Sequence, residues 1–314
     1  MILLRGVEIR NNKRENLKIQ IETIKNKKID SFIPPVLVIF QIGDNKASGV
    51  YIEQKKQFAA YIGAEVLHIK LPDDIEEEEV LEEIRNYNND SSVHGIIVQL
   101  PIPKNLSVHN ITNEIDYRKD VDGLSSTSLG LLVDRDFNEK KNSESKIVDD
   151  DFRKSVFKGF IPATTKGVLS LFEYYDIELE GKNVCIVGRS VLVGKPTALV
   201  ILAKNATITV CHSKTKNLKD ITKAADIIIS AIGVPNMIDE SYVSLGQTII
   251  DIGIVSREEK NENGESVRKL CGDVAFDEVS KIVNAITPVP GGVGPLTVAS
   301  LFENLFESFY NTLL

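Results

Sequence analysis

The sequence contains no tryptophan, two methionines and three cysteines among its 314 residues. The cysteines, Cys185, Cys211 and Cys271, show no Cys-x-x-Cys spacing, and two of them lie in apolar, strand-like runs. This pattern favours buried, reduced thiols over a disulfide framework or a metal site. We therefore expect a cytoplasmic protein with no bound metal, because disulfides are rare in that compartment.

Long apolar runs and an excess of positive charge are also missing. No stretch reaches the ~18 apolar residues of a membrane-spanning helix, and the apolar patch in MILLRGVEIRNNK is too short for a signal peptide. The formal net charge is −8, and no stripe of Lys and Arg offsets it, which argues against nucleic acid as a partner. The composition is that of an ordinary globular protein, and the length is sufficient for two domains.

Apolar runs of strand length alternate with helix-like periods along the chain. The apolar runs occupy 36–43, 65–71, 94–100, 184–188, 206–212, 226–233 and 247–254. The helix-like stretches include 48–62, 75–87, one ending near 175 and one ending near 205. Apolar strands separated by helices are typical of parallel sheets that are covered on both faces. We therefore predict an α/β protein with two domains.

Two polar segments stand out in the sequence. Segment 133–158 is long and poor in periodic apolar residues, so it is either a functional loop or a mobile insertion, and we favour the insertion. The glutamate run 76–79 has the composition of a metal site. At helical spacing it more often forms a solvated face at a helix start, where anions are stabilised.

The stretch VCIVGRSVLVGKPTA (184–198) is a strand-to-helix turn that fits neither common phosphate fingerprint. A P-loop needs four residues between its glycines, but five separate Gly188 from Gly194, and Pro196 stands where Ser or Thr is required. The dinucleotide pattern would need glycine at Ser190 and Val193. The turn is therefore either a plain tight turn or a phosphate site at a helix N-terminus.

The end of the next apolar run favours NADP over NAD. In NAD-binding sites an acidic residue about 20 positions after the glycine turn holds the ribose hydroxyls. Here that place is taken by His212, Ser213, Lys214 and Thr215, with no carboxylate. A hydroxyl among cations, together with Arg189 in the turn, suits an additional 2′-phosphate.

Three motifs in the first half of the chain carry candidate chemistry. Tyr51 and Lys55 share a helix face at i, i+4. Such a pair is common on surfaces, and it also occurs in short-chain dehydrogenases, although there it follows the nucleotide turn. Gln99 ends the apolar run of GIIVQLPIP at the sheet edge where α/β ligands bind. Asp122 in KDVDG is either a ligand-binding carboxylate or part of an Asx turn.

Together these segments resemble the bifunctional methylenetetrahydrofolate dehydrogenase/cyclohydrolase family over nearly the full length of the chain. The matching segments are the Tyr51/Lys55 helix, GIIVQLPIP, KDVDG, VGRS-x-x-VGKP, ATITVCHSKT, DIGI, GDV and TPVPGGVGPLT. The resemblance implies a folate-binding catalytic domain (1–161 with 296–314) and a Rossmann-like NADP-binding domain (162–295), with a cleft between them. It also implies a homodimer formed through the NADP-binding domains.

The resemblance further implies residue roles. Lys55 is the central catalytic residue and Gln99 tunes it, while Tyr51 stacks on the folate and Asp122 holds the pterin. The implied substrate-binding residues are Tyr51, Gln99, Leu100, Pro101, Asp122, Gly294 and Pro295. The implied NADP-binding residues are Gly188, Arg189, Ser190, Gly194, Ser213, Ile254 and Thr297.

The chain departs from the family pattern in three places. Where the family has Pro-x-Thr-Pro-x-Gly this chain reads PATTKG (162–167), and we expect Thr165 to cap the helix that starts there. Ser128 replaces an asparagine, which we expect to alter a contact near the hinge. Segment 133–158 is longer than in the family.

The implied reaction oxidises 5,10-methylenetetrahydrofolate with NADP⁺ and hydrolyses the methenyl product to 10-formyltetrahydrofolate. The substrates would be tetrahydrofolate derivatives, with or without a polyglutamate tail. Two alternatives remain at this stage. One is another two-domain NAD(P) dehydrogenase that acts on an amino or hydroxy acid, and the other is a catalytically silent nucleotide- or folate-binding protein.

Overall fold

The computed structural model describes residues 1–27, 32–135, 158–260 and 266–313, which divide into two compact units. Among these residues, unit 1 comprises 1–10 and 164–297, and unit 2 comprises 11–135, 158–163 and 298–313. Residues 136–157 of the expected insertion lie outside the described residues. Each unit contains a parallel sheet with helices, which confirms the predicted α/β class.

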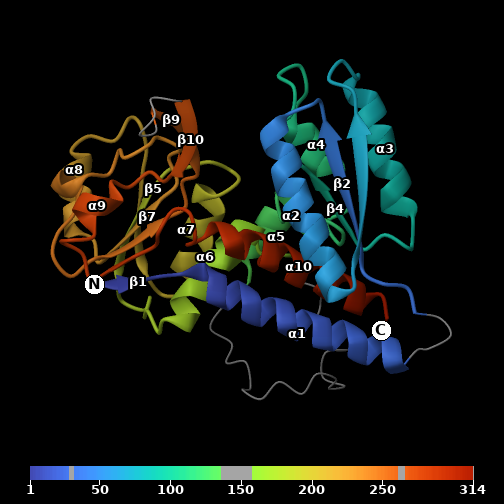
Figure 1. Cartoon of the computed structure of the whole chain (residues 1–314), viewed down its shortest axis with the longest axis horizontal. Helices are drawn as coiled ribbons and strands as arrows, with labels where there is room; N and C mark the ends of the chain where they lie inside the picture. Colours follow the sequence, from blue (N-terminus) through green and yellow to red (C-terminus); the bar gives the residue numbers. More distant parts are fainter. Residues whose placement is uncertain (28–31, 136–157, 261–265, 314) are drawn as a thin grey trace. The chain divides into compact units, whose positions relative to one another are not determined.

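Unit 2 is built on a three-stranded parallel sheet in the order β3-β2-β4 (Figure 1). Its strands are β2 (Val36–Ile42), β3 (Glu65–Leu71) and β4 (Gly95–Val98). Its helices are α2 (Lys46–Ile62), α3 (Glu77–Asn89), α4 (Val108–Glu114) and α5 (Ser126–Val133), with most of α1 (Gly6–Lys27) and α10 (Gly294–Asn311). The three predicted strands therefore form one sheet.

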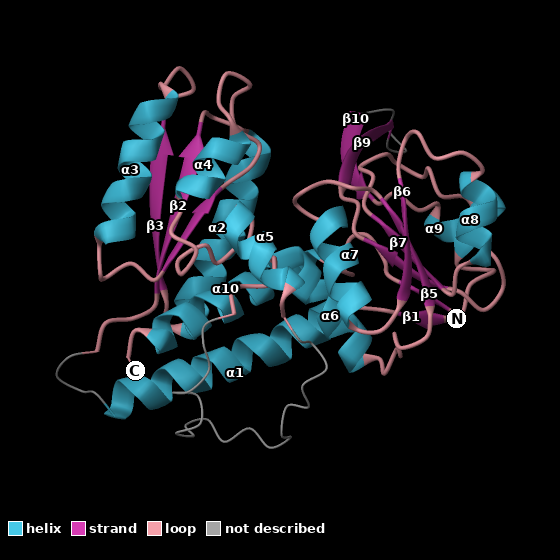
Figure 2. Cartoon of the chain, turned by 180° about the vertical axis from the view of Figure 1, so that it is seen from behind, coloured by secondary structure: helices cyan, strands magenta, loops and turns pink. Residues whose placement is uncertain are grey.

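Alternate residues of these strands face two separate cores, as the period of two in a strand requires. Leu37 and Ile39 pack with α2 and α10 on one face. Val38 and Phe40 pack with α3 and α4 on the other face. Figures 1 and 2 show the sheet from opposite sides. Because both faces are covered, β2 is buried along its whole length.

Unit 1 is built on a six-stranded parallel sheet in the order β1-β11-β8-β7-β5-β6. Its strands are β1 (Ile2–Leu3), β5 (Asn183–Val187), β6 (Thr207–Cys211), β7 (Ile227–Ser230), β8 (Thr248–Asp251) and β11 (Ala285–Ile286). Its helices are α6 (Ala163–Tyr174), α7 (Gly194–Ala203), α8 (Leu218–Ala224), α9 (Phe276–Val279) and the short η2 (Glu240–Tyr242). A separate antiparallel hairpin pairs β9 (Val255–Lys260) with β10 (Ser266–Cys271).

The division at the N-terminus differs from the boundaries expected from the sequence. Residues 1–10 group with unit 1, whereas the predicted folate-binding domain included them. The physical reason is β1, which extends the six-stranded sheet by pairing with β11. A strand of two residues leaves no pattern in the sequence that would reveal this pairing.

The glutamate run at the start of α3 makes local contacts within unit 2. Glu79 accepts a hydrogen bond from the backbone N–H of Glu76 at 3.2 Å. Glu77 accepts from the backbone of Ser107 at 2.6 Å, and Glu78 pairs with Arg85 at 2.7 Å. These contacts agree with the solvated helix start that we expected.

None of the helices in the described part of the chain combines the length and the apolar character that a membrane span needs.

His94, directly before β4, is a buried histidine that accepts a hydrogen bond in its neutral form. Its Nδ1 accepts from the backbone N–H of Val36 at 3.1 Å, and its ring packs edge-on against Phe309. Burial, with the charge of Lys119 nearby, lowers the pKa of His94 to about 4. In the unfolded chain the value is about 6.5, so the native state resists protonation of this ring.

We therefore expect His94 to make unit 2 sensitive to acid. Its contribution is complete above pH ~6.5 and is lost as the pH falls towards 4, by up to about 3 kcal/mol. His94→Asn keeps an acceptor but does not titrate. Urea unfolding at neutral and acidic pH should show a smaller loss of stability in the variant than in the wild type, and equal losses would contradict this assignment.

Candidate active site

The polar side chains of unit 2 meet where α2 passes the end of β4. The ammonium of Lys55 on α2 donates a hydrogen bond to Gln99 Oε1 at 2.6 Å. The other end of that amide donates to the carbonyl of Leu100 at 2.9 Å, which directs Oε1 towards the lysine. The Leu100–Pro101 peptide bond is cis. The predicted Lys55 and Gln99 are therefore in direct contact.

Asp122 is the third charged or polar group of this site. Burial lowers the pKa of Lys55, and the carboxylate of Asp122 opposes that effect. Burial also raises the pKa of Asp122 to about 6, although the charge of Lys55 counteracts the rise. Two groups of opposite charge with pKa values shifted towards neutrality are typical of proton-transfer sites.

Two further side chains of α2 belong to this region. Tyr51 lies one turn before Lys55 and is 37% exposed, so its ring is accessible to a ligand. Ser48, two turns before Lys55, is buried, and its hydroxyl has no hydrogen-bond partner among the described residues. Sequence reasoning missed Ser48, because a single serine at a helix start gives no signal of burial.

The KDVDG turn that carries Asp122 is organised around a buried carboxylate. Asp120 accepts from the backbone N–H groups of Gly123, Leu124 and Ser125 at 3.1, 3.2 and 2.8 Å. It also accepts from the hydroxyl of Ser128 at 2.7 Å. Ser128, a departure from the family pattern, therefore contacts the turn that presents Asp122. Sequence reasoning did not identify Asp120 as the centre of this turn.

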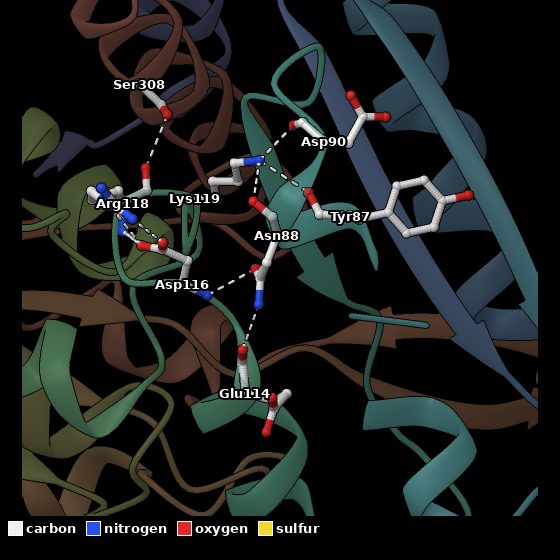
Figure 3. Close-up of polar contacts among 8 residues, drawn as sticks. All are labelled: Tyr87, Asn88, Asp90, Glu114, Asp116, Arg118, Lys119 and Ser308. Carbon is white, nitrogen blue, oxygen red and sulfur yellow. Dashed lines mark hydrogen bonds and ion pairs between the residues drawn. The ribbon is translucent and has the colours of Figure 1, made fainter. Parts of the chain in front are cut away.

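A second set of contacts holds the start of the same turn (Figure 3). Lys119 Nζ donates to three carbonyls at the end of α3 and beyond, those of Tyr87, Asn88 and Asp90, at 3.0, 2.8 and 2.7 Å. Ser308 on α10 donates to the carbonyl of Arg118 at 3.0 Å. The turn is therefore attached to α3 and to α10, which fixes the backbone that leads to Asp122.

In unit 1, the turn between β5 and α7 is closely packed against itself. Gly188 has a φ of +129°, and a Cβ on Gly194 would lie 2.3 Å from the carbonyl oxygen of Gly188. Both positions therefore require glycine. The hydroxyl of Ser190 accepts from the backbone N–H groups of Val193 and Gly194 at 3.2 and 3.4 Å. The helix α7 therefore begins directly after a turn that contains Arg189 and Ser190.

The turn after β6 lies beside the turn that joins β5 to α7, because β5 and β6 are neighbouring strands and Val187 pairs with Cys211. His212 Nδ1 accepts from the backbone of Lys214 at 3.1 Å, and Thr215 Oγ1 accepts from the backbone of His212 at 2.9 Å. These bonds fix the backbone and leave the side chain of Ser213 exposed. The exposed Arg189 and Ser213 therefore follow the ends of adjacent strands.

Two buried carboxylates at the ends of strands in unit 1 were not identified from the sequence. Asp251 accepts three backbone N–H groups, and burial raises its pKa to about 7. Asp273 accepts from the hydroxyl of Ser230 and from three backbone N–H groups in 232–234. The motifs DIGI and GDV contain these residues, but the sequence does not show that they meet.

The remaining predicted residues of unit 1 lie around the start of α10. Ile254 is 42% exposed, and its side chain is next to Gly294. Pro295 is half-buried, and Thr297 Oγ1 lies 3.5 Å from Thr164 Oγ1. Thr165 does not cap α6 as we expected. Its buried hydroxyl instead meets that of Thr197 at 3.0 Å.

Comparisons with known proteins agree over both units. The family model "Tetrahydrofolate dehydrogenase/cyclohydrolase, catalytic domain" matches residues 4–122, and the corresponding "NAD(P)-binding domain" model matches residues 162–313. A bifunctional protein FolD of Agathobacter rectalis is 41% identical over 307 residues, which are 98% of this chain and 98% of that protein.

Solved structures show the same similarity. The bifunctional FolD enzyme of Campylobacter jejuni is 38% identical, covers 99% of both chains and has a TM-score of 0.84. The Trypanosoma brucei enzyme, solved with NADP and an inhibitor, is 28% identical and has a TM-score of 0.86. That match covers 100% of this chain and 98% of the other.

Proposed function

Because this chain belongs to the tetrahydrofolate dehydrogenase/cyclohydrolase family, we propose that unit 1 binds NADP and that unit 2 binds the folate at Lys55, Gln99 and Asp122. The protein is a bifunctional methylenetetrahydrofolate dehydrogenase and methenyltetrahydrofolate cyclohydrolase with an NAD(P)-binding domain. The observation that carries the residue assignment is the 2.6 Å contact between Lys55 and Gln99 beside Asp122.

Hydrolysis is the step that needs a proton carrier. Water adds to the methenyl carbon of the cation and loses a proton. The ring C–N bond then breaks as that nitrogen gains a proton, and the remaining hydroxyl proton passes to the solvent as the formyl C=O forms. Burial lowers the pKa of Lys55, so a larger fraction of its amine is neutral near pH 7 than in an exposed lysine. The neutral amine accepts the proton of the attacking water, and the resulting ammonium returns it to the leaving nitrogen.

Oxidation depends on orientation more than on acid–base catalysis. Bound NADP⁺ would supply the acceptor for a hydride from the methylene carbon, and no proton would move in that step. Tyr51 offers an exposed ring on which the aromatic part of the folate can stack. The half-buried Asp122 carboxylate can accept hydrogen bonds from the N–H groups of the pterin. These two residues would hold the ends of the reacting ring system.

We propose further that the cofactor of unit 1 is NADP rather than NAD. Arg189 and Ser213 follow adjacent strands, and the turn after β6 carries no carboxylate that would repel a 2′-phosphate. Among the described residues, Arg189 has no ion-pair partner. Its guanidinium can therefore bind a phosphate without breaking an existing ion pair.

Arg189→Ala should raise the KM for NADP⁺ about tenfold or more and leave the KM for NAD⁺ nearly unchanged. A charge-assisted hydrogen bond contributes roughly 1.5–3 kcal/mol, and NAD⁺ lacks the phosphate that would form it. Initial rates with methylenetetrahydrofolate and each cofactor measure the two constants. Equal losses with both cofactors would show that Arg189 acts elsewhere in the turn.

We also propose a homodimer formed through unit 1. The support is β6, which is the last strand in the order of the six-stranded sheet and carries an exposed Val210. Light scattering at several concentrations tests this state.

A cytoplasmic location stays a prediction. The free thiols of Cys185 and Cys211, whose sulfur atoms lie 3.8 Å apart, suit a reducing compartment.

A further inference from the structure

We infer that Asp251 and Asp273, two buried carboxylates of unit 1, are positioning residues for hydride transfer, because they hold the two loops on which the nicotinamide of the cofactor lies. These loops follow β7 and β8. Neither carboxylate belongs to the proposed cofactor-binding or catalytic set. The inference rests on the proposed binding of NADP to unit 1 and concerns how its reacting end is oriented.

The first observation is the place of the two loops on the six-stranded sheet. In the strand order, β6 lies on one side of β5, while β7 and β8 lie on the other side. Dinucleotides bind across the carboxyl ends of such strands, where the strand order reverses. The proposed phosphate contacts, Arg189 after β5 and Ser213 after β6, occupy the β6 side. The nicotinamide half therefore extends towards the ends of β7 and β8.

The loop after β7 directly adjoins the proposed phosphate turn. A Cβ on Gly188 would overlap the carbonyl oxygen of Ala231, the first residue after β7. Further along the two loops, the apolar side chains of Val234 and Ile254 are exposed. Apolar side chains next to a phosphate turn offer a surface on which the flat nicotinamide ring can lie.

Asp273 holds the loop after β7. Its Oδ2 accepts hydrogen bonds from the backbone N–H of Ile232 at 2.7 Å and from the hydroxyl of Ser230 at 3.0 Å. Its Oδ1 accepts from the backbone N–H groups of Gly233 and Val234 at 2.9 and 3.0 Å. Three consecutive N–H groups therefore point at one buried carboxylate, and this fixes the backbone that carries the exposed Val234.

Asp251, the last residue of β8, holds the other loop and also the segment that carries Asp273. Its Oδ1 accepts from the backbone N–H groups of Gly253 at 2.9 Å and of Asp273 at 3.1 Å. Its Oδ2 accepts from the backbone N–H of Val274 at 2.9 Å. Gly253 directly precedes the exposed Ile254. The two carboxylates therefore connect the loop after β8 with the loop after β7.

Two glycines allow the carboxylates to approach the backbone closely. A Cβ on Gly272 would overlap Asp251 Oδ2, and a Cβ on Gly253 would overlap the carboxylate of Asp273. Burial, with a contribution from the charge of Asp273, raises the pKa of Asp251 to about 7. In the described part of the chain, neither carboxylate has an ion-pair partner. The N–H groups of the loops therefore stabilise these carboxylates in place of a cation.

The arrangement should affect orientation more than affinity. The proposed phosphate contacts lie at the turns after β5 and β6, whereas the carboxylates hold the loops after β7 and β8. A displacement of a reacting group by about 1 Å can lower a rate by about 10²-fold. Hydrolysis depends on Lys55 of unit 2 and uses no nicotinamide. Loss of a carboxylate should therefore slow oxidation and leave hydrolysis nearly unchanged.

The test measures three quantities in full-length Asp273→Asn: the kcat for oxidation of methylenetetrahydrofolate, the rate of hydrolysis of supplied methenyltetrahydrofolate, and the Kd for NADP⁺ by calorimetry. The amide keeps the shape of the side chain, but its NH₂ end cannot accept the N–H groups that Asp273 holds. We expect the kcat for oxidation to fall about 10- to 100-fold. The hydrolysis rate and the Kd should stay within about threefold of the wild type.

Ser230→Ala is a milder variant that removes one of the four donors to Asp273. We expect the kcat for oxidation to fall about 3- to 10-fold, with hydrolysis and the Kd for NADP⁺ again unchanged. If Asp273→Asn binds no NADP⁺ because unit 1 does not fold, this variant decides the question. The control is Asp226→Asn, since the exposed Asp226 also accepts a backbone N–H, that of Asn183 at 2.7 Å, but precedes β7. It should keep the wild-type kcat for oxidation.

An unchanged kcat for oxidation in the variants that bind NADP⁺, or an equal fall in oxidation and hydrolysis, would overturn the inference while the proposed function stands. An equal fall indicates a smaller fraction of folded enzyme and no specific effect on the nicotinamide. A wild type that oxidises methylenetetrahydrofolate with neither NADP⁺ nor NAD⁺ would overturn the proposed function and this inference with it.

Discussion

Replacement of Lys55 by methionine is expected to lower the rate of methenyltetrahydrofolate hydrolysis by ~10²–10⁴-fold, the range typical of general acid–base groups. Methionine keeps most of the length of the side chain but carries no proton. Because Lys55 donates to Gln99 at 2.6 Å, the variant also leaves that amide oxygen without its donor. Hydrolysis of supplied methenyltetrahydrofolate, followed by its absorbance, isolates this step from hydride transfer.

The binding of NADP⁺ should survive the Lys55→Met substitution, because the proposed cofactor residues belong to unit 1. Thermal shift with and without NADP⁺ measures this. Lys25→Met provides a matched control, as Lys25 is an exposed lysine in the last turn of α1. A hydrolysis rate within threefold of the wild type in Lys55→Met would mean that the proton carrier lies elsewhere and that the Tyr51–Lys55 spacing is only a helix face.

The second large effect is expected from Asp122→Asn, which keeps the shape of the side chain but removes its charge. The KM for the folate should rise about 10- to 100-fold, because a hydrogen bond to a charged group contributes roughly 1.5–3 kcal/mol. The charge of Asp122 raises the pKa of Lys55. Its removal should therefore lower that pKa further and enlarge the neutral fraction of the amine.

The pH dependence distinguishes this role from a structural one. If the neutral amine is the active form, the rate of hydrolysis rises with pH as Lys55 loses its proton. In Asp122→Asn this rising limb should shift to lower pH, whereas a merely structural loss would lower the profile without moving it. Since the pKa of Asp122 is about 6, the two profiles should differ most above that pH. An unmoved limb would contradict the proposed coupling.

The strands β2 and β4 were predictable because each is buried along its length, and the partly exposed β3 was predictable from its apolar residues. The expected strand at 36–43 corresponds to β2 (Val36–Ile42), and the expected strand at 65–71 corresponds to β3 (Glu65–Leu71). A fully buried strand reads as a continuous apolar run, and Gly43 marks the end of β2. The helix period likewise placed Tyr51 and Lys55 on α2.

The interactions between elements were not predictable from the same patterns. The contact of Lys55 with Gln99 joins residues 44 positions apart. Patterns in a single sequence indicate only contacts between residues that are close to one another in the chain. Asp120 looks like its neighbour Asp122 in KDVDG, yet only Asp120 accepts three backbone N–H groups of its own turn. The resemblance to a family supplied the roles of Lys55 and Gln99, while the physical reason for them required the folded chain.

The central claim is that unit 2 holds Lys55 as a proton carrier with a lowered pKa. The most direct test is a titration of its amine by NMR in protein labelled with ¹³C at the lysine side chains, with the Lys55 signal assigned by its loss in Lys55→Met. We predict that Lys55 titrates clearly below the ordinary lysine value of 10.5, as its burial requires. Titration of Lys55 at or above that value would contradict the claim.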